Sequence, residues 1–373
     1  MILNRKQEEG LKIAVSRYRS GELWTCIAGY AGTGKSTLVS HIIQALNLLP
    51  DEVTYATFTG KAAQVLQQKG CPNATTAHKL LYHFQKSGIY YISTPKPTYE
   101  LSKFKLIVVD EVSMLPGSMW DLLISHGIHV IALGDPGQLP PIYETNGVLD
   151  EPHIFLDEIM RQAKENEIIR ISMDIREGKP LELFDGANVK IIDKHSVVPG
   201  MLSWADQIIC AKNDTRQGLN KFYREYFLKF NSDEVQNGDK VICLRNEWRK
   251  FSNERYNLIN GTIGYVEHLN LIPNHPMDGS CFVDLRGEMG DIFSNLCINL
   301  NYNEYIGNNL KGKIPKPVPF DFGYAITCWK AQGSQWNKIL LYEENFPFDR
   351  QEKKRYLYTG ITRAIDKVVI VRK

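Results

Sequence analysis

A glycine-rich octet near the N-terminus constrains the fold of this chain more than any other feature. Residues 29–36 read GYAGTGKS and match the phosphate-binding pattern G-x-x-x-x-G-K-[ST] in full. The apolar run at residues 23–28 predicts a strand before the octet, and apolar residues three and four apart across residues 36–46 predict a helix after it. Strand, glycine turn and helix form the context that this pattern requires, so we expect the octet to bind a nucleoside triphosphate within an α/β domain.

Each residue type in the octet has a physical role in phosphate binding. Its glycines let successive backbone N–H groups point into one concavity, and the N-terminus of the following helix adds partial positive charge. We expect Lys35 to reach the outer phosphates and Ser36 to ligate a magnesium ion. The residues predicted to bind the nucleotide here are Gly29, Ala31, Gly32, Thr33, Gly34, Lys35, Ser36 and Thr37.

Composition narrows the class of protein but does not decide its partner. The 373 residues suffice for about two to three domains, and a formal net charge of +2 neither supports nor excludes nucleic acid. The seven cysteines form no C-x-x-C pair, which predicts reduced thiols rather than a zinc site. Residues 1–20 are rich in charge and no run approaches ~18 apolar residues, so we expect a soluble cytoplasmic protein without a membrane segment.

Two further apolar runs are each followed by side chains that can bind a ligand or take part in catalysis. Residues 106–109 precede Asp110 and Glu111, and residues 130–133 precede the loop GDPGQLPP. Such runs, separated by helical stretches, predict a parallel sheet covered on both faces, with ligands at the C-terminal ends of its strands. We assign Asp110 to the magnesium ion and Glu111 to polarisation of the attacking water, although two carboxylates can also merely solvate a strand end. Gln138 is a candidate sensor of the terminal phosphate.

Six ordered segments resemble a known family. They read GYAGTGKST, VVDEVSM, LGDPGQLPPI, LDEIMRQ, AITCWKAQGSQW and YLYTGITRA. In this order and spacing they resemble the superfamily 1 helicases of the RecD/Dda type, known as superfamily 1B, from Gln7 to about residue 371. The resemblance implies an α/β fold of two RecA-like parallel-sheet domains, a P-loop NTPase, with a small hairpin inserted in the first domain and an SH3-like β-barrel inserted in the second.

The pattern of apolar and turn-forming residues indicates where these insertions lie in the chain. A strand-like run at residues 206–211 and an amphipathic helix from Asn213 to about residue 228 precede a turn-rich, β-rich stretch that begins at Asn237. Such a stretch is typical of a small barrel inserted into a host domain. The predicted limits are residues 1–82 and 105–190 for the first RecA-like domain, 83–104 for the hairpin, 191–236 and 320–373 for the second RecA-like domain, and 237–319 for the barrel.

The resemblance also implies roles for individual residues. Gln7 would recognise adenine, Gln332 and Gly333 would contact the nucleotide, and Arg161 and Arg363 would meet the γ-phosphate. A planar, permanently charged guanidinium suits the charge of a phosphoryl transition state, whereas an arginine taken alone is more typical of a surface ion pair. The residues implied in binding single-stranded nucleic acid are Thr59, Gly60, Lys61, Thr76, His78, Pro140, Trp329 and Lys330.

Three of these assignments have an alternative. Thr59 also suits the N-cap of a helix, and both roles can hold at once. Trp329 stands where many relatives carry histidine, and an indole can either stack on a base or pack in a core. The predicted hairpin corresponds to the family's separation pin, where Tyr90 or Tyr91 would either wedge the duplex or pack under its own hairpin.

The activity that the resemblance implies is ATP hydrolysis coupled to DNA unwinding, with ATP and Mg²⁺ as cofactors and with single-stranded DNA and a DNA fork as partners. Movement from 5′ to 3′ is implied by the resemblance alone. We expect a monomer, because both halves of the nucleotide cleft lie in one chain. Two alternatives are a DNA-stimulated ATPase that remodels nucleoprotein without unwinding, which would keep every motif, and a small-molecule or nucleotide kinase, which would have no use for Gln332 and Arg363.

Overall fold

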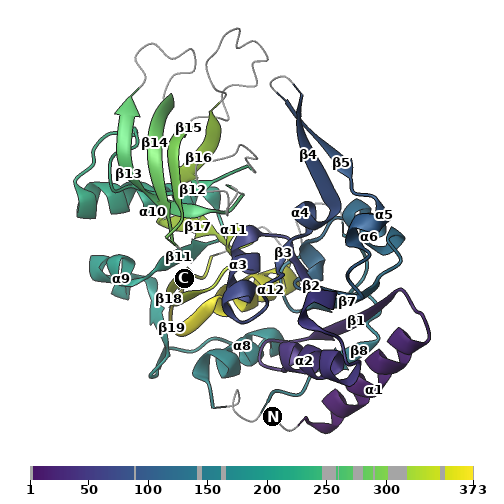
Figure 1. The fold of residues 1–373 in the computed structure, drawn as a ribbon. Coiled ribbons are helices and arrows are strands. Elements are labelled where there is room, and N and C mark those ends of the chain that lie inside the picture. The colour runs from purple at the N-terminus through teal and green to yellow at the C-terminus, as the bar shows by residue number, and fades with distance from the viewer. Residues whose placement is uncertain are drawn as a thin grey trace. The chain divides into compact units, whose positions relative to one another are not determined.

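The protein is described by a computed structural model that covers residues 3–87, 90–140, 145–160, 165–245, 258, 260–271, 280–288, 290–300, 317–344 and 349–372 (Figure 1). The chain divides into two compact units. The first unit comprises Met1–His195 and Gln332–Lys373, and the second comprises Ser196–Ala331. These units do not coincide with the two predicted α/β domains, because residues 332–373 group with the N-terminal half. The predicted domain limits stay a prediction.

The first unit contains the expected parallel sheet. Its strands lie in the order β3-β2-β6-β7-β1-β8, and each neighbouring pair is parallel. Their bounds are Trp24–Gly29 for β1, Val53–Thr57 for β2, Thr75–Thr76 for β3, Leu106–Val109 for β6, His129–Gly134 for β7 and Ile154–Leu156 for β8. Strands β1, β6 and β7 are the three apolar runs, so the prediction of parallel strands is confirmed. Their C-terminal ends meet at one edge of the sheet.

Both faces of this sheet are buried, which explains the unbroken apolar runs. In β6, Leu106 and Val108 pack into a core that includes residues of helices α1 and α2. Ile107 and Val109 point to the opposite face and pack into a second core with residues of α4 and α6 (Figure 1). Since successive side chains in a strand alternate between faces, a strand covered on both sides must be apolar at every position.

The described helices of the first unit are α1 to α6, α8 and α12. Their bounds are Arg5–Arg19 for α1, Lys35–Ala45 for α2, Gly60–Gln68 for α3, Ala77–Leu81 for α4, Thr98–Leu101 for α5, Gly117–Ser125 for α6, Glu167–Glu177 for α8 and Arg350–Ile361 for α12, with short 3₁₀ turns at Pro50–Glu52, Val112–Met114 and Lys194–Ser196. Of all helices in the described ranges, none has the length and apolar character that a bilayer crossing requires.

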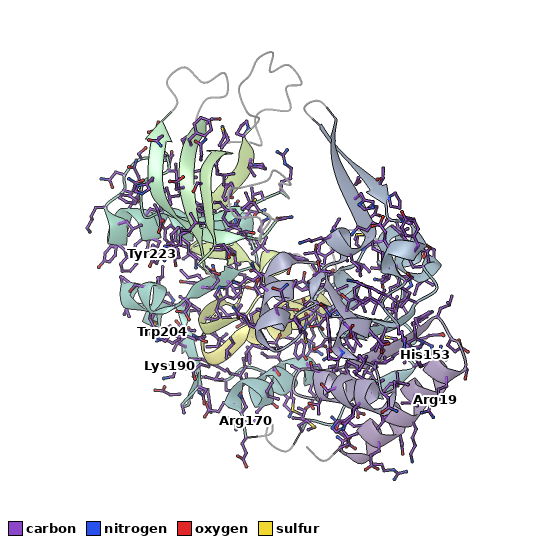
Figure 2. All side chains as sticks on the ribbon, viewed as in Figure 1. Arg19, His153, Arg170, Lys190, Trp204 and Tyr223 are labelled. Carbon is purple, nitrogen blue, oxygen red and sulfur yellow. The ribbon has the colours of Figure 1, made fainter. Side chains whose placement is uncertain are left out.

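Side chains as well as backbone tie the edge strand β8 to β1. His153, labelled in Figure 2, precedes β8, and its Nδ1 accepts a hydrogen bond of 2.9 Å from the backbone N–H of Cys26. The same ring lies edge-on to Trp24, with 4.6 Å between ring centroids. These contacts secure the strand that carries the phosphate loop at its end.

The predicted hairpin insertion is present. Strands β4, Tyr82–Ser87, and β5, Tyr90–Pro95, pair antiparallel, with Ser87 opposite Tyr90. Tyr90 and Tyr91 therefore begin the second strand. Their side chains lie outside the described part of the structure, so the assignment of either tyrosine as the wedge stays a prediction.

The last strand of the first unit pairs with a strand that lies just before Ser196 in the sequence. Strand β19, Ala364–Arg372, lies between β18, Trp336–Tyr342, and β10, Val189–Asp193, and is parallel to both. Strand β9, Phe184–Asp185, adds an antiparallel edge beside β10. Helix α12 connects β18 to β19, which is the crossover expected between parallel strands.

The second unit contains a parallel strand pair and a closed barrel. The pair is β11, Gln207–Cys210, with β17, Ala325–Thr327, and the helices are α9, Pro199–Trp204, α10, Asn213–Tyr223, a π-helix at Arg224–Leu228, and α11, Cys328–Ala331. The barrel strands are β12, Lys240–Cys243, β13, Ile263–Leu271, β14, Ser280–Gly287, β15, Ile292–Asn299, and β16, Val318–Phe322. The predicted barrel is confirmed, and its last strand runs past the predicted limit at residue 319.

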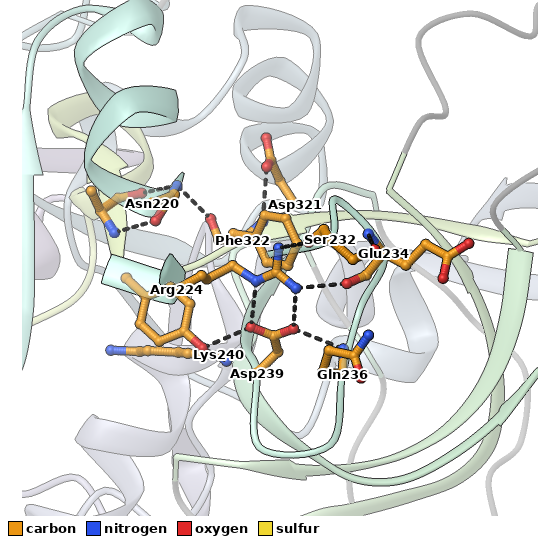
Figure 3. Close-up of polar contacts among 11 residues, drawn as sticks. Asn220, Arg224, Ser232, Glu234, Gln236, Asp239, Lys240, Asp321 and Phe322 are labelled. Carbon is orange, nitrogen blue, oxygen red and sulfur yellow. Dashed lines mark hydrogen bonds and ion pairs between the residues drawn. The ribbon is translucent and has the colours of Figure 1, made fainter. Parts of the chain in front are cut away.

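A buried ion pair connects the π-helix of the second unit to the start of the barrel (Figure 3). Arg224 donates from Nε and Nη2 to the two carboxylate oxygens of Asp239, at 2.9 and 3.0 Å. The two side chains are 4% and 0% exposed. Asp239 also accepts hydrogen bonds from the backbone N–H of Gln236 and from the hydroxyl of Tyr324. Both charges are thus matched within the protein, as burial requires.

Candidate functional site

A cavity of about 570 Å³ lies in the first unit at the C-terminal ends of β1, β6 and β7. Parallel sheets place ligands at this edge, because loops from neighbouring strands converge there. The predicted site residues that line the cavity are Ala31, Gly32, Lys35, Ser36, Asp110, Glu111, Gln138, Gly333 and Arg363. The fold therefore gathers around one cavity residues that extend from the phosphate loop to the end of α12.

The phosphate loop has the conformation that its glycines allow. Gly32 and Gly34 adopt φ angles of 76° and 79°, in the left-handed region that side chains with a Cβ rarely occupy. The Thr33 hydroxyl is buried and donates to the carbonyl of Tyr30 at 2.8 Å. The Lys35 ammonium donates to the carbonyls of Gly29 and Tyr30, at 2.6 and 3.1 Å. The loop thus curves around its own lysine at the N-terminus of α2.

Gln7 lies buried beneath the phosphate loop rather than in the cavity lining. Its Nε2 donates to the Thr33 carbonyl at 3.1 Å, and its Oε1 accepts the backbone N–H of Asn4 at 3.0 Å. Asn4 in turn caps α1, so that the two side chains form a capping box. A Cβ added at Gly34 would lie 2.5 Å from Nε2 of Gln7, a second reason for glycine there. Gln7 supports the loop from below, and its adenine contact stays a prediction.

The two carboxylates after β6 differ in environment. Burial raises the pKa of Asp110, the adjacent Glu111 raises it further, and the nearby Lys35 opposes both. Glu111 has a φ of 52°, a left-handed conformation that non-glycine residues rarely adopt and that is concentrated at functional sites. Ser36 and Asp110 line the same cavity, and the hard oxygen donors of such side chains suit Mg²⁺. A cation beside Asp110 would favour its ionised form.

Arg363 meets Glu111 in the cavity. Its Nη1 donates to Oε1 of Glu111 at 3.1 Å, and its side chain is only 5% exposed. The guanidinium also donates from Nε to the carbonyl of Thr359 at 3.2 Å, one turn earlier in α12. The structure thus brings a permanent cation to the carboxylate predicted to activate water. Arg161, the other predicted phosphate arginine, lies outside the described residues.

The loop after β7 is joined to the C-terminal segment by two hydrogen bonds at one residue. The Leu139 carbonyl accepts from Nε2 of Gln332 at 2.8 Å, and its N–H donates to the hydroxyl of Thr359 at 2.8 Å. Gln138, the predicted sensor, precedes Leu139 and lines the cavity, and Pro140 follows it. Gln332 therefore contacts the sensor loop, and its predicted contact with the nucleotide stays a prediction.

Sequence reasoning gave no role to Tyr358, whose hydroxyl lies between two loops of the site. It accepts the backbone N–H of Ala31 at 2.8 Å and donates to Oδ2 of Asp135 at 2.7 Å. In the sequence, the one sign of this role was its place inside the segment YLYTGITRA, two residues after another tyrosine. Nothing in that spacing distinguishes Tyr358 from Tyr356.

The predicted nucleic-acid residues of the first unit lie at the N-termini of α3 and α4. The hydroxyls of Thr59 and Thr76 each accept a backbone N–H from the first turn of these helices, which confirms the N-cap alternative for Thr59. Gly60 is the first residue of α3. The Lys61 ammonium lies 4.2 Å from the ring centroid of Trp336, and burial lowers the pKa of His78.

The corresponding residues of the second unit lie in α11. Burial lowers the pKa of Lys330, and the neighbouring guanidinium of Arg216 lowers it further. Arg216 itself pairs with Asp321. Trp329 is half-buried in the same helix, and both its predicted roles, base stacking and core packing, remain open.

Two family models match the chain in the order that its motifs predict. A model described as an AAA domain matches residues 2–200, which is more than half of the chain. A model described as a UvrD-like helicase C-terminal domain matches residues 322–371. The two matches cover the phosphate loop at one end and Arg363 at the other.

Curated relatives include several proteins named as DNA helicases. The ATP-dependent RecD2 DNA helicase of Deinococcus radiodurans is 26% identical, in an alignment that covers 97% of this chain and 49% of that protein. The ATP-dependent DNA helicase dda of Enterobacteria phage T4 is 25% identical over 52% of this chain and 46% of its own length. The chain thus spans about half the length of the curated relatives that it matches.

Solved structures with the same fold include two Pif1 helicases. The Pif1 helicase from Candida albicans has a TM-score of 0.53 at 17% identity, with 100% of this chain and 94% of that chain covered. The Pif1 helicase from Bacteroides, in complex with ADP-AlF3 and ssDNA, has a TM-score of 0.55 at 18% identity, with 99% and 92% covered. These likenesses confirm the predicted fold of two RecA-like domains with a barrel insertion. The two family models and the RecD2 and dda relatives together show that the chain belongs to the RecD/Dda type of superfamily 1 helicases, superfamily 1B.

Proposed function

We propose that this protein is an ATP-dependent DNA helicase that moves along single-stranded DNA from 5′ to 3′ and couples ATP hydrolysis to separation of the duplex. One observation carries the proposal: Arg363 contacts Glu111 inside the cavity formed by the phosphate loop. The two residues are 252 positions apart in the chain. A kinase has no need of such a distant arginine, whereas a helicase uses it to link hydrolysis to a change of conformation.

Each residue of the cavity has its own role in ATP hydrolysis. Lys35 and the backbone N–H groups of the phosphate loop bind the phosphates of ATP, and Lys35 exchanges its two carbonyl acceptors for phosphate oxygens. Ser36 and Asp110 are the residues that would hold Mg²⁺, which when bound neutralises phosphate charge. Glu111 orients the attacking water and accepts its proton.

Arg363 supplies the positive charge for the transition state. Before ATP binds, its guanidinium is held by Glu111 and by the Thr359 carbonyl. With ATP in the cavity the γ-phosphate becomes the stronger partner for the guanidinium, because it carries more negative charge. Arg161 would act in the same way from the other side, and Gln138 would offer its amide to the same phosphate. Each nucleotide state thus favours a different set of contacts, which is the requirement for a conformational cycle.

During this cycle the protein moves along a strand of DNA. The relatives named above are DNA helicases, and the Bacteroides Pif1 structure contains ssDNA. In this chain the N-termini of α3 and α4 offer hydroxyl, lysine and histidine groups to a DNA backbone, through Thr59, Lys61, Thr76 and His78. Trp329 and Lys330 would contact the strand from the second unit. The hairpin of β4 and β5 would part the duplex.

Strand separation on tailed duplexes tests the proposal. The protein should unwind a duplex with a 5′ single-stranded tail when ATP and magnesium are present, and Lys35→Ala should abolish both hydrolysis and unwinding. Unwinding from a 3′ tail alone would overturn the direction of movement. Hydrolysis stimulated by DNA without any unwinding would favour the nucleoprotein remodeller instead.

A further inference from the structure

We propose that Tyr358 is a positioning residue for ATP hydrolysis: its hydroxyl ties the phosphate loop and the loop after β7 to the helix that presents Arg363 to the cavity. This inference rests on the proposed function. It adds to that function a physical connection between an occupied phosphate loop and the arginine that stabilises the transition state.

The Tyr358 hydroxyl makes two hydrogen bonds with opposite polarity. It accepts the N–H of Ala31 at 2.8 Å and donates its own proton to Oδ2 of Asp135 at 2.7 Å. Ala31 belongs to the phosphate loop and Asp135 to the loop after β7, and both residues line the cavity. Tyr358 is only 2% exposed, so water does not compete for these bonds. A single oxygen atom thus connects three segments of the chain.

The surroundings hold the Tyr358 ring in this one orientation. A Cβ added at Gly137 would lie 3.1 Å from Cε1 of the ring, so the ring lies close against the loop backbone. The Gly137 N–H donates to Oδ1 of Asp135 at 2.9 Å, which turns Oδ2 toward the hydroxyl. Burial raises the pKa of Tyr358, and the charge of Asp135 raises it further, so the hydroxyl stays protonated as a donor.

Helix α12 connects this hydroxyl to the catalytic arginine. Tyr358 lies in the last turn of α12, which ends at Ile361, and Arg363 follows in the turn that leads to β19. Between them, Thr359 accepts the Leu139 N–H with its hydroxyl and the Arg363 Nε–H with its carbonyl. Because the Thr359 carbonyl holds Nε of Arg363, a displacement of Ala31 or Asp135 that moves Tyr358 also moves the guanidinium.

The test compares two buried tyrosines of the same helix. Tyr358→Phe removes the hydroxyl and keeps the ring. Tyr356→Phe is the matched control, because Tyr356 is fully buried and its hydroxyl donates to the Tyr342 carbonyl at 2.6 Å, in a contact with β18 that does not involve the cavity. Loss of a hydrogen bond to a charged group should lower kcat for ATP hydrolysis about tenfold in Tyr358→Phe. The KM for ATP should change less than about twofold, since Lys35 and the loop amides remain, and Tyr356→Phe should keep the wild-type kcat.

Two measurements decide between the outcomes. The first is kcat and KM for DNA-stimulated ATP hydrolysis in the wild type and both variants. A wild-type kcat in Tyr358→Phe, or an equal loss in both variants, overturns the positioning role.

The second is amide hydrogen exchange without nucleotide. The Ala31 N–H should exchange faster in Tyr358→Phe than in the wild type, and at the wild-type rate in Tyr356→Phe. Unchanged protection in Tyr358→Phe would overturn the contact itself. A wild type that hydrolyses no ATP would refute the proposed function, while the exchange result would still test the contact.

Discussion

The guanidinium of Arg363 donates a hydrogen bond of 3.1 Å to the carboxylate of Glu111, although the two residues are 252 positions apart. The pair lines the same cavity as Lys35 and Ser36. Glu111 is held in a left-handed backbone conformation, and Arg363 is almost fully buried. The pair therefore combines backbone strain with buried charge, two features that are concentrated at active sites.

Glu111→Gln should abolish hydrolysis without abolishing nucleotide binding. Glutamine keeps an oxygen that can accept from Arg363 but cannot take a proton from water, so kcat should fall by about 10² to 10⁴. Hydrolysis assays and the binding of a fluorescent ATP analogue check the two halves of this prediction. Glu151→Gln, at an exposed position before β8, serves as the control. A variant that retains a tenth of the wild-type kcat would exclude Glu111 as the general base.

Arg363→Ala should lower kcat by about 10³ or more, because an arginine on the γ-phosphate stabilises charge that appears in the transition state. Arg363→Lys should recover little of this loss, since an ammonium lacks the planar fork that bonds to two acceptors at once. Steady-state hydrolysis in the presence of single-stranded DNA provides the measurement. The control is Arg350→Ala, an exposed arginine at the start of α12, the helix that precedes Arg363. Equal rates in the two alanine variants would remove Arg363 from the catalytic machinery.

Asp110→Asn should stabilise the protein at neutral pH when magnesium is absent. The pKa of Asp110 is raised by burial and by Glu111, so the folded state holds this proton to a higher pH than the unfolded state does. The resulting contribution to the free energy of unfolding is present at low pH and is lost as the pH rises through the folded pKa. Asparagine avoids the loss.

Thermal unfolding between pH 4 and pH 8 in a chelator checks this prediction about Asp110. The Asp110→Asn variant should melt above the wild type at pH 7.5, and the difference should shrink toward pH 4. Added magnesium should raise the melting temperature of the wild type more than that of the variant. Asp185→Asn, at an exposed position, should match the wild type throughout. Equal melting of Asp110→Asn and the wild type at pH 7.5 would contradict the pKa direction.

Asp239→Ala should destabilise the second unit by about 3 to 5 kcal/mol, because it leaves the buried Arg224 without its partner. Denaturant unfolding, followed by intrinsic fluorescence, measures the loss. Asp185→Ala is the matched control. It breaks the pair with Lys190, in which the aspartate side chain is 76% exposed, and should cost less than about 1 kcal/mol. Similar losses in both variants would mean that the buried pair contributes no more than a surface pair.

Replacing Tyr90 and Tyr91 together by alanine should reduce unwinding several-fold and spare ATP hydrolysis. Both tyrosines begin β5, opposite the last residues of β4, and a flat aromatic at that place can replace the stacking partner of the first parted base pair. Parallel assays of strand separation and hydrolysis provide the test. Tyr99→Ala, which removes a 74% exposed tyrosine from α5, is the control. Unchanged unwinding in the double variant would refute the wedge.

Much of the fold could be predicted because its signals are local. Unbroken apolar runs predicted β1, β6 and β7, since a strand covered on both faces is apolar at every position. The two left-handed glycines of the phosphate loop and the N-cap at Thr59 also follow from the conformational preferences of single residues. Turn signals after Asn237 predicted the barrel but could not locate its last strand, because strand ends depend on pairing partners far away in the sequence.

The candidate site was predictable as a set of residues but not as a set of contacts. The motifs identified Lys35, Asp110, Glu111 and Arg363 as site residues. Nothing in their spacing indicated that Arg363 would donate a hydrogen bond to Glu111 when no phosphate is bound. Gln7 was expected to face the nucleotide, and the structure places it beneath the loop with both ends of its amide already bonded inside the protein.

The sequence by itself determined strands β1, β6 and β7 and the start of the phosphate loop, because these depend on neighbours within a few residues, and the order of its motifs indicated the family. The tertiary structure alone decided which hydroxyl, carboxylate and guanidinium meet. Tyr356 and Tyr358 stand two positions apart in one helix, and only packing directs one hydroxyl to β18 and the other to Ala31 and Asp135. A hydrogen bond requires two atoms within about 3 Å of each other, and for residues hundreds of positions apart only the folded chain sets that distance.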